Sequence, residues 1–296
     1  MRQENNDLAP LILWNPAIRM SMTLPQPSCI DVPIYNYYCV YGFGFDHITN
    51  DYKVLRMVFH AYKSFLLRAE LYKLRTGSWE TVGGVDNFQY VAYRGRQALV
   101  NGASHWIGCH KSYMPIESRD FSEFVVVLFH MCHEEFRVMK LPDRLSNFRS
   151  DDAILKVSDG LLSLFIKHRH ASLSCNIWLM KEYGVVESWS KQYTLDLEGW
   201  CFERMYSFRN NKKILGTERE KPFLYDPETD IFTSLGNLRM KDDGFFFTTS
   251  TFVESLVLLN QVNALQTCQT CLKKAGDATQ RKERKRIEKE DMQKDG

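Results

Sequence analysis

The sequence lacks long hydrophobic runs and any strong excess of charge of one sign. Its longest apolar stretch, Phe124–Phe129, is far shorter than the roughly 18 residues that a membrane-spanning helix needs. The N-terminus, MRQENNDLAP, has no apolar core behind a basic start, so it does not indicate a secretory signal. The formal net charge of +2 argues against a basic face for nucleic acid. We therefore expect a soluble protein of the cytoplasm and/or nucleus, with no membrane partner and no nucleic-acid partner.

The short motifs of common enzyme classes are also missing. There is no G-x-S-x-G nucleophile elbow and no P-loop, and Gly42–Gly44 lacks the third glycine of a dinucleotide fingerprint. His130 and Cys132 would share one face of a strand, but His133 would point to the other face. The C-x-x-C pair at 268–271 is half of a zinc site. We predict no catalytic, cofactor-binding or metal-binding residue.

Cysteine placement and charge placement divide the chain. The eight cysteines are scattered, and without a secretory signal they are expected to be reduced thiols rather than a disulfide framework. The C-terminal 24 residues hold 9 Lys/Arg and 6 Asp/Glu, so the basic excess lies there. We predict a polar lead-in at 1–10, a β-rich domain at 11–262, and a charged tail at 263–296 that is disordered or helical. Arg281–Arg286 in that tail fits a nuclear localisation signal, a weak phosphate binder or a solvated helix face.

A spacing between aromatic residues recurs along the β-rich region. An aromatic residue follows another by seven positions at three places: Tyr72 and Trp79, Phe129 and Phe136, and Tyr225 and Phe232. Polar, turn-forming residues lie between the members of each pair, which predicts a β-hairpin. Two further copies are degenerate. Trp14 has Ser21 in the second position, and Trp178 is followed by Trp189 after a longer turn at Tyr183–Gly184.

A second hairpin signal precedes most of these pairs. Asn101-Gly102 and Asp159-Gly160 favour the positive φ angles of a type I′ turn, and Asn50-Asp51 and Asn210-Asn211 occupy comparable places. Two hairpins in about 50 residues match the size of one kelch-like propeller blade. The pattern predicts an all-β fold: a kelch-like β-propeller or an incomplete propeller of repeated antiparallel hairpins. A β-sandwich is the alternative.

The β-rich region also contains a series of distinctive sequence motifs. They are LWNP at 13–16, YGFGFD at 41–46, DYKVLRM at 51–57, AELYKLRTGSW at 69–79, LVNGASHWIG at 99–108, VVVLFHMCHEEFRVMKLPD at 125–143, IWLMKEYGVVESWSK at 177–191, LYDPETDIF at 224–232 and FVESLVLLN at 252–260. These motifs, in this order, resemble those of the F-box-associated interaction domain of plant F-box and F-box/kelch-repeat proteins.

The resemblance implies a non-enzymatic domain that recognises substrate proteins for an SCF-type ubiquitin ligase, and thus for ubiquitin-dependent degradation. In family members an F-box before LWNP docks a Skp-type adaptor, which binds cullin. Only MRQENNDLAPLI precedes Leu13, so adaptor and cullin are expected as partners only if the F-box is supplied elsewhere. The alternatives are a stand-alone β-propeller enzyme, or a decoy binding protein that is not coupled to ubiquitination.

The large aromatic residues of these motifs are expected to fill the core, because they lie on apolar strand faces. They are Trp14, Tyr72, Trp79, Trp106, Phe129, Trp178 and Trp189. Lys181, Glu182 and Glu187 are expected to be either a solvated hairpin or a charged rim that selects a partner. Partner contacts are predicted in irregular loops, where Tyr and Arg suit interface hot spots. The candidate partner-binding residues are Tyr35, Tyr37, Tyr38, Tyr90, Tyr93 and Arg94.

Overall fold

A computed structural model describes the greater part of the chain. The described residues are 10–28, 36–61, 65–83, 88–91, 97–110, 124–145, 148, 152–168, 174–196, 202–208, 213–218, 221–235 and 255. The chain divides into a smaller unit, made of Met1–Ser28, Lys73–Ser78 and Phe252–Gly296, and a larger unit, made of Cys29–Tyr72 and Trp79–Thr251. Each is described by itself. Within the described ranges, no helix is both long and apolar enough to span a bilayer.

In the part of the smaller unit that the structure describes, β1 (Ile12–Asn15) and β2 (Met20–Thr23) form a hairpin. Trp14 lies opposite Ser21, the pairing predicted for this degenerate repeat. The Asn15 side chain donates to the Ser255 carbonyl at 2.8 Å, which ties the hairpin to the C-terminal part of the same unit. Trp14 itself is 69% exposed, so its predicted place in the core is wrong. On a strand with period-two alternation, buried Asn15 takes the inward face and Trp14 the outward one.

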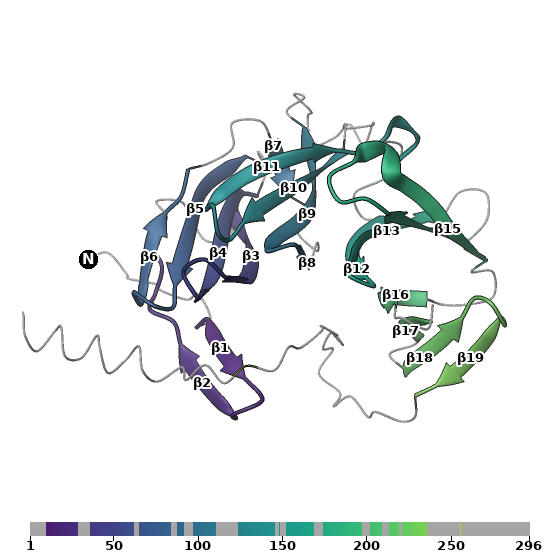
Figure 1. The fold of residues 1–296 in the computed structure, drawn as a ribbon, viewed down its shortest axis with the longest axis horizontal. Helices are drawn as coiled ribbons and strands as arrows, with labels where there is room; N and C mark the ends of the chain where they lie inside the picture. Colours follow the sequence, from purple (N-terminus) through teal and green to yellow (C-terminus); the bar gives the residue numbers. More distant parts are fainter. Residues whose placement is uncertain are drawn as a thin grey trace, which may run out of the picture. The chain divides into compact units, whose positions relative to one another are not determined.

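The described residues of the larger unit form four antiparallel sheets, which follow one another in chain order (Figure 1). The first holds β3 (Tyr37–Asp46), β4 (Asp51–His60), β5 (Leu66–Lys73) and β6 (Ser78–Thr81). The second holds β7 (Phe88–Val91), β8 (Ala98–Val100), β9 (Ala103–His110), β10 (Phe124–His130) and β11 (Glu135–Lys140).

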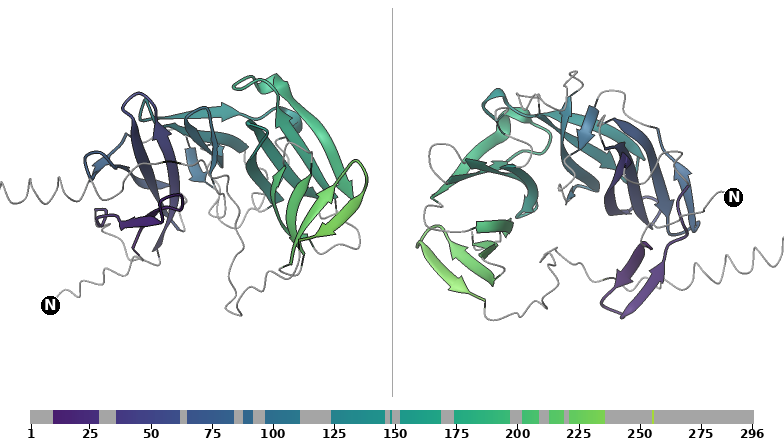
Figure 2. Two further views of the ribbon diagram at one scale, coloured as in Figure 1. Left: turned by 60° about the horizontal axis from the view of Figure 1, so that its bottom comes forward. Right: turned by 180° about the vertical axis from the view of Figure 1, so that it is seen from behind.

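In the third and fourth sheets, as in the first, strands that follow one another in the chain lie side by side in the sheet. The third holds β12 (Ala153–Ser158), β13 (Leu161–His168), β14 (Ser174–Met180) and β15 (Trp189–Asp196), with short 3₁₀ turns η2 (Asp143–Leu145) before it and η4 (Val186–Ser188) within it. The fourth holds β16 (Phe202–Phe208), β17 (Ile214–Glu218), β18 (Lys221–Asp226) and β19 (Ile231–Ser234). Figure 2 shows the sheets as separate layers. The predicted all-β, propeller-like architecture of repeated hairpins is confirmed; its charged tail lies outside the described residues.

The aromatic spacing of seven has a simple origin in hairpin register. Phe129 lies directly opposite Phe136, and Tyr225 opposite Phe232, because a four-residue turn follows one residue after the first aromatic. Their ring centroids lie 4.8 Å and 4.2 Å apart, as cross-strand aromatic pairs require.

The predicted Trp178 and Trp189 pair has a different register. Trp178 lies opposite Lys191 and Trp189 opposite Met180, because the eight-residue connection Lys181–Ser188 between β14 and β15 sets this register. A β-bulge follows farther from the turn, where the register shifts between Ile177 and Trp178.

Tight turns close the inner hairpins as the sequence predicts. Asn101 and Gly102 have φ angles of 50° and 70°, and Asp159 and Gly160 have φ angles of 51° and 77°. Both residues of each pair therefore occupy the left-handed region that a type I′ turn needs. Asn50 also has a positive φ, at 53°, whereas Asn210-Asn211 lies outside the described residues.

Consecutive sheets pack through three separate apolar cores, here named the first, second and third seams. The first seam joins the first and second sheets through Val40, Leu55, Met57, Phe59, Leu71, Trp106, Val125, Val127, Phe129 and Met131. The second seam joins the second and third sheets through Ile107, Phe124, Val126, Leu155, Leu164, Met180 and Trp189, among others. The third seam joins the third and fourth sheets through Phe165, Cys175, Ile177, Leu195, Ile214, Phe223 and Tyr225. Four predicted core aromatics, Tyr72, Trp106, Phe129 and Trp189, are buried as expected.

Candidate interaction surface

The two faces of β3 differ sharply in composition. Val40, Gly42, Gly44 and Asp46 are buried, while the residues between them point outward. Tyr41, Phe43 and Phe45 are 37%, 41% and 36% exposed. These three residues, named the β3 stripe, form a row of large apolar side chains along the edge strand of the first sheet. Clustered exposed aromatics of this kind mark interaction sites more often than scattered ones do.

The buried face of β3 explains why the aromatics lie on the other one. A Cβ atom on Gly42 would lie 2.9 Å from Cζ2 of Trp106, and one on Gly44 would lie 2.8 Å from Cγ of Met131. Such distances leave no room for any side chain, so the second sheet approaches the β3 backbone directly. Large residues are therefore restricted to the outward positions of this strand.

Neighbouring side chains hold the β3 stripe in place. Tyr52 of β4 stacks on Phe43, with ring centroids 5.5 Å apart, and contacts Phe45 at 4.9 Å. The Phe43 backbone N–H donates to Oε1 of Gln97 at 2.6 Å, and Nε2 of Gln97 donates to the Phe43 carbonyl at 2.8 Å. Since Gln97 satisfies both backbone groups of Phe43, a partner would meet the exposed rings rather than that point of the strand edge.

The turn that follows β3 continues the exposed apolar surface. Ile48 is 65% exposed. Its position is set by Asp46, whose Oδ1 accepts from the backbone N–H groups of Ile48 and Thr49 at 2.9 Å and 3.3 Å. The Thr49 hydroxyl donates to the other carboxylate oxygen at 2.6 Å. These bonds fix the conformation of the turn and so hold the Ile48 side chain in its exposed position.

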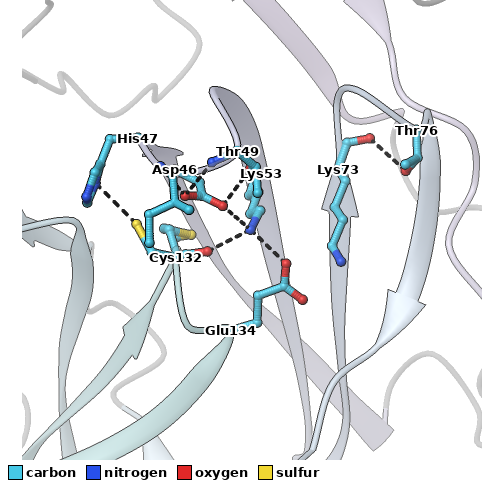
Figure 3. Close-up of polar contacts among 10 residues, drawn as sticks. Asp46, His47, Thr49, Lys53, Lys73, Thr76, Cys132 and Glu134 are labelled. Atoms are coloured by element: carbon cyan, nitrogen blue, oxygen red, sulfur yellow. Dashed lines mark hydrogen bonds and ion pairs between the residues drawn. The ribbon is translucent and has the colours of Figure 1, made fainter.

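A buried ion cluster anchors this turn to the second sheet (Figure 3). Lys53 Nζ lies 2.6 Å from Oδ2 of Asp46 and 2.7 Å from Oε1 of Glu134, and it donates to the Met131 carbonyl at 2.8 Å. Lys53 is 1% exposed and Asp46 is fully buried. Burial opposes ionisation of both groups, but their mutual hydrogen bonds outweigh it. The pKa of Asp46 is lowered and the pKa of Lys53 is raised, so both remain charged.

The cluster continues into a thiol–imidazole contact at the surface. Sγ of Cys132 lies 3.2 Å from Nδ1 of His47, and Figure 3 shows the pair beside Asp46. Burial and a hydrogen bond to Asp46 raise the pKa of the Cys132 thiol, which disfavours the reactive thiolate. The rings of His130 and His133 touch each other, with centroids 5.3 Å apart. Among the described residues, no three His, Cys, Asp or Glu side chains converge as metal ligands would.

The predicted partner-binding residues fall in different environments. Tyr37 is half-buried and lies opposite His60. Tyr38 stacks on Phe59 at 5.4 Å and packs against the first seam, which suits a structural role. The backbone of Tyr90 lies in β7, whereas Tyr35, Tyr93 and Arg94 lie outside the described residues. A role in partner binding stays a prediction for all six. Lys181, Glu182 and Glu187 are exposed on the β14–β15 turn, which fits a solvated hairpin and a charged rim alike.

The β3 stripe was not among the predicted contacts, although the sequence carries its signal. Aromatic residues alternate with glycine in YGFGFD. That alternation indicates one strand face pressed against backbone and the other face rich in rings. Glycine is also a common turn former, and the pattern can be mistaken for a turn on that ground.

Comparison with known proteins gives a consistent set of relatives. F-box protein CPR1 of Arabidopsis thaliana is 28% identical over 280 residues, covering 86% of this chain and 65% of that protein. F-box protein At3g07870 is 29% identical over 206 residues, and F-box/kelch-repeat protein At3g23880 is 28% identical over 185 residues, both from the same plant. The alignments with these two cover 62% and 61% of this chain and 46% of each relative. The chain thus spans less than two thirds of the length of these relatives.

Two further comparisons concern structure and family. Zg3597, a family 117 glycoside hydrolase of the marine bacterium Zobellia galactanivorans, aligns with a TM-score of 0.42 and 7% identity over 68% of this chain and 70% of that one. A likeness of that size supports no inference about activity. The model of the F-box associated beta propeller domain matches residues 4–259, and this chain therefore belongs to the F-box associated β-propeller domain family.

Proposed function

We propose that this chain is a substrate-recognition domain that binds proteins destined for ubiquitination by an SCF-type ligase. The match of residues 4–259 to the F-box associated β-propeller family carries the proposal. The relatives that align over most of the chain are named as F-box proteins. In this role the domain performs no chemistry itself and acts by holding a protein partner.

The β3 stripe is the proposed centre of the binding surface. Tyr41, Phe43 and Phe45 supply large, rigid rings whose burial against a partner releases water at little cost in side-chain entropy. Ile48 extends the apolar area toward the turn, and the Lys53 cluster keeps that turn fixed. A preorganised apolar row of this kind suits a partner that contributes uncharged side chains.

Coupling to the ligase is a separate part of the proposal. A Skp-type adaptor and cullin would be reached through an F-box, either joined to this domain or supplied by another chain. The place of action would be the cytoplasm and/or the nucleus, where SCF-type ligases work. The alternative of a decoy, which binds substrates without delivering them, differs only in this coupling.

Affinity capture tests recognition and coupling together. The tagged chain is expressed in plant cells with the proteasome inhibited, and captured proteins are identified by mass spectrometry. The test variant carries Phe43→Ser and Phe45→Ser. The matched control carries Ile231→Ser and Leu235→Ser, which remove two other exposed apolar side chains, 57% and 44% exposed, from β19 and the residue directly after it.

The expected result is a set of captured proteins that the control retains and the Phe43/Phe45 variant loses at least ten-fold, with thermal midpoints unchanged. Presence of the adaptor and cullin in the wild-type capture supports ligase coupling. Capture without them supports the decoy. Equal capture by all three proteins would show that the β3 stripe is not the binding surface.

A further inference from the structure

A buried histidine bridges the second seam. His105 lies on β9, has no exposed surface, and faces the third sheet together with Ile107. Its Nδ1 atom lies 2.9 Å from the Ala98 carbonyl. A carbonyl oxygen only accepts, so Nδ1 carries the ring hydrogen and Nε2 is left as an acceptor. The Tyr183 hydroxyl lies 2.9 Å from Nε2 and donates to it.

Tyr183 reaches His105 from the opposite sheet. It belongs to the turn between β14 and β15, and its ring packs against the second seam, edge-on to the imidazole at 5.6 Å. The turn is held by Ser188, whose hydroxyl donates to the Glu182 carbonyl at 2.9 Å and accepts from the Glu182 backbone N–H at 3.1 Å. Gly184, with φ of 84°, lets the backbone reverse beside Tyr183. The hydroxyl is therefore presented across the seam by a shaped turn.

We propose that the His105–Tyr183 bond is an acid-sensitive fastening, and that uptake of one proton by the imidazole loosens the second seam. The proton binds Nε2, the atom that accepts from Tyr183. The hydroxyl would then have to turn around and accept, and its own hydrogen would lose its acceptor. The imidazolium would also lie in an apolar seam beside groups of its own sign.

The surroundings make that proton costly. The basic side chain of His130 on β10 lowers the pKa of His105 electrostatically. The basic side chain of Arg137 on β11 opposes the rise in the pKa of Tyr183 that burial causes. His133 and Glu135 act on His130, with opposite effects, at the edge of this group. Burial is the largest influence on His105 and lowers its pKa to about 4, with His130 adding to the effect, while hydrogen bonds to the carbonyls of Ala98 and Ala103 oppose it.

The sign of the pH effect follows from these values. The pKa of His105 is about 4 in the closed seam and near its ordinary 6.5 once the seam opens. The open form therefore binds the proton more tightly, and acid favours opening. The fastening is fully present above pH 6.5 and is lost as the pH falls toward 4. At pH 5 the opening equilibrium is expected to rise about 30-fold above its value at pH 8.

Hydrogen exchange followed by mass spectrometry tests this on the intact chain, with rates expressed as protection factors at pH 8 and pH 5. Protection of the amides at 98–107 and 181–189 is expected to fall about 30-fold, while the first seam stays protected. In His105→Asn, which cannot titrate, the two pH values should give equal protection. The control His168→Asn changes a histidine on the third sheet that lies outside this seam and should behave as the wild type.

Tyr183→Phe keeps the ring but removes the hydroxyl, and it guards against failure of His105→Asn to fold. Its second seam should already be less protected at pH 8, with a smaller further change at pH 5. The proposal is overturned if wild-type protection at the second seam is the same at both pH values. It is also overturned if His105→Asn keeps the acid sensitivity, or if Tyr183→Phe matches the wild type throughout.

Discussion

The first and second seams join similar sheets but are fastened by opposite kinds of polar contact. The first is crossed by a fully charged cluster, in which Lys53 meets Asp46 and Glu134. The second is crossed by the neutral pair His105 and Tyr183. A buried charge is tolerated only while its counter-charges stay in place, whereas a neutral pair costs less to bury and less to lose. The packing geometry of the first seam should therefore be the more strictly specified, and substitutions there should cost more stability than substitutions at the second seam.

The two seams also differ in how closely the sheets approach. At the first, glycines of β3 lie against Trp106 and Met131 with no intervening side chain. At the second, side chains of the second sheet, Ile107 and Val126 among them, pack against side chains of the third, including Leu155 and Trp189. Close backbone approach leaves no space to absorb an added atom, while side chains packed against each other adjust by changing rotamer. Both comparisons rank the first seam as the more sensitive, and substitutions measure the difference.

Lys53→Met should have the largest effect. It leaves the buried carboxylate of Asp46 and the carboxylate of Glu134 without their cation, which typically costs about 3–5 kcal/mol of unfolding free energy. Urea unfolding measures the loss. The control Lys140→Met removes an exposed lysine from β11 and should change stability by less than about 0.5 kcal/mol. A loss below about 1 kcal/mol for Lys53→Met would contradict a charged first seam.

The pH dependence of the same variant sharpens this test. In the wild type the pKa of Asp46 is lowered from its ordinary 3.8, so its contribution is present above pH 3.8 and is lost as the pH falls further. Without Lys53, burial should raise that pKa instead, because desolvation is the largest influence on the carboxylate and only the hydrogen bonds from Thr49, Cys132 and Ile48 remain to oppose it. The deficit of Lys53→Met should then shrink as the pH falls from 7 to 4. A deficit that is constant over this range would mean that lost packing, not lost charge pairing, causes it.

Gly42→Ala should come next, at about 1–3 kcal/mol, because its Cβ would lie 2.9 Å from a ring carbon of Trp106 in a packed core. Gly44→Ala should cost less, since the flexible Met131 side chain can move aside. Gly83→Ala is the matched control, with no atom within 4 Å of the added Cβ. Thermal unfolding should rank the three in that order. Equal midpoints for Gly42→Ala and Gly83→Ala would show that the sheets do not approach as closely as the geometry requires.

The sequence predicted local hairpins well because their determinants are local. Phe129 and Phe136, or Asn101 and Gly102, lie within a few residues of each other, and turn length alone fixes their pairing. Trp178 pairs with Lys191 rather than with Trp189 because of the length of the Lys181–Ser188 connection, which the spacing of the two tryptophans alone could not reveal.

The seams were harder to predict because they join residues far apart in the chain. Lys53 and Glu134 are 81 residues apart, and Lys53 lies in DYKVLRM, where a lysine would be expected to be solvated. Trp14 shows the converse failure, since an aromatic repeat position alone does not specify what covers it. The alternation in YGFGFD places the aromatic side chains on one face of β3. Only the contact of Gly42 with buried Trp106 explains why glycine occupies the other face.

Arg144→Lys should give the smallest effect of the series. The guanidinium carbon of Arg144 lies 5.4 Å from the centroid of the Trp178 ring, and the same group donates to the Trp189 carbonyl at the edge of the second seam. Lysine keeps the charge but loses the planar stacking and the directed hydrogen bond, for an expected cost of about 1 kcal/mol. Arg137→Lys is the control, because its pair with Glu135 is exposed and contributes little. If urea unfolding gives the two variants equal stability, Arg144 does not fasten the second seam, and the polar fastening of that seam falls to His105 and Tyr183.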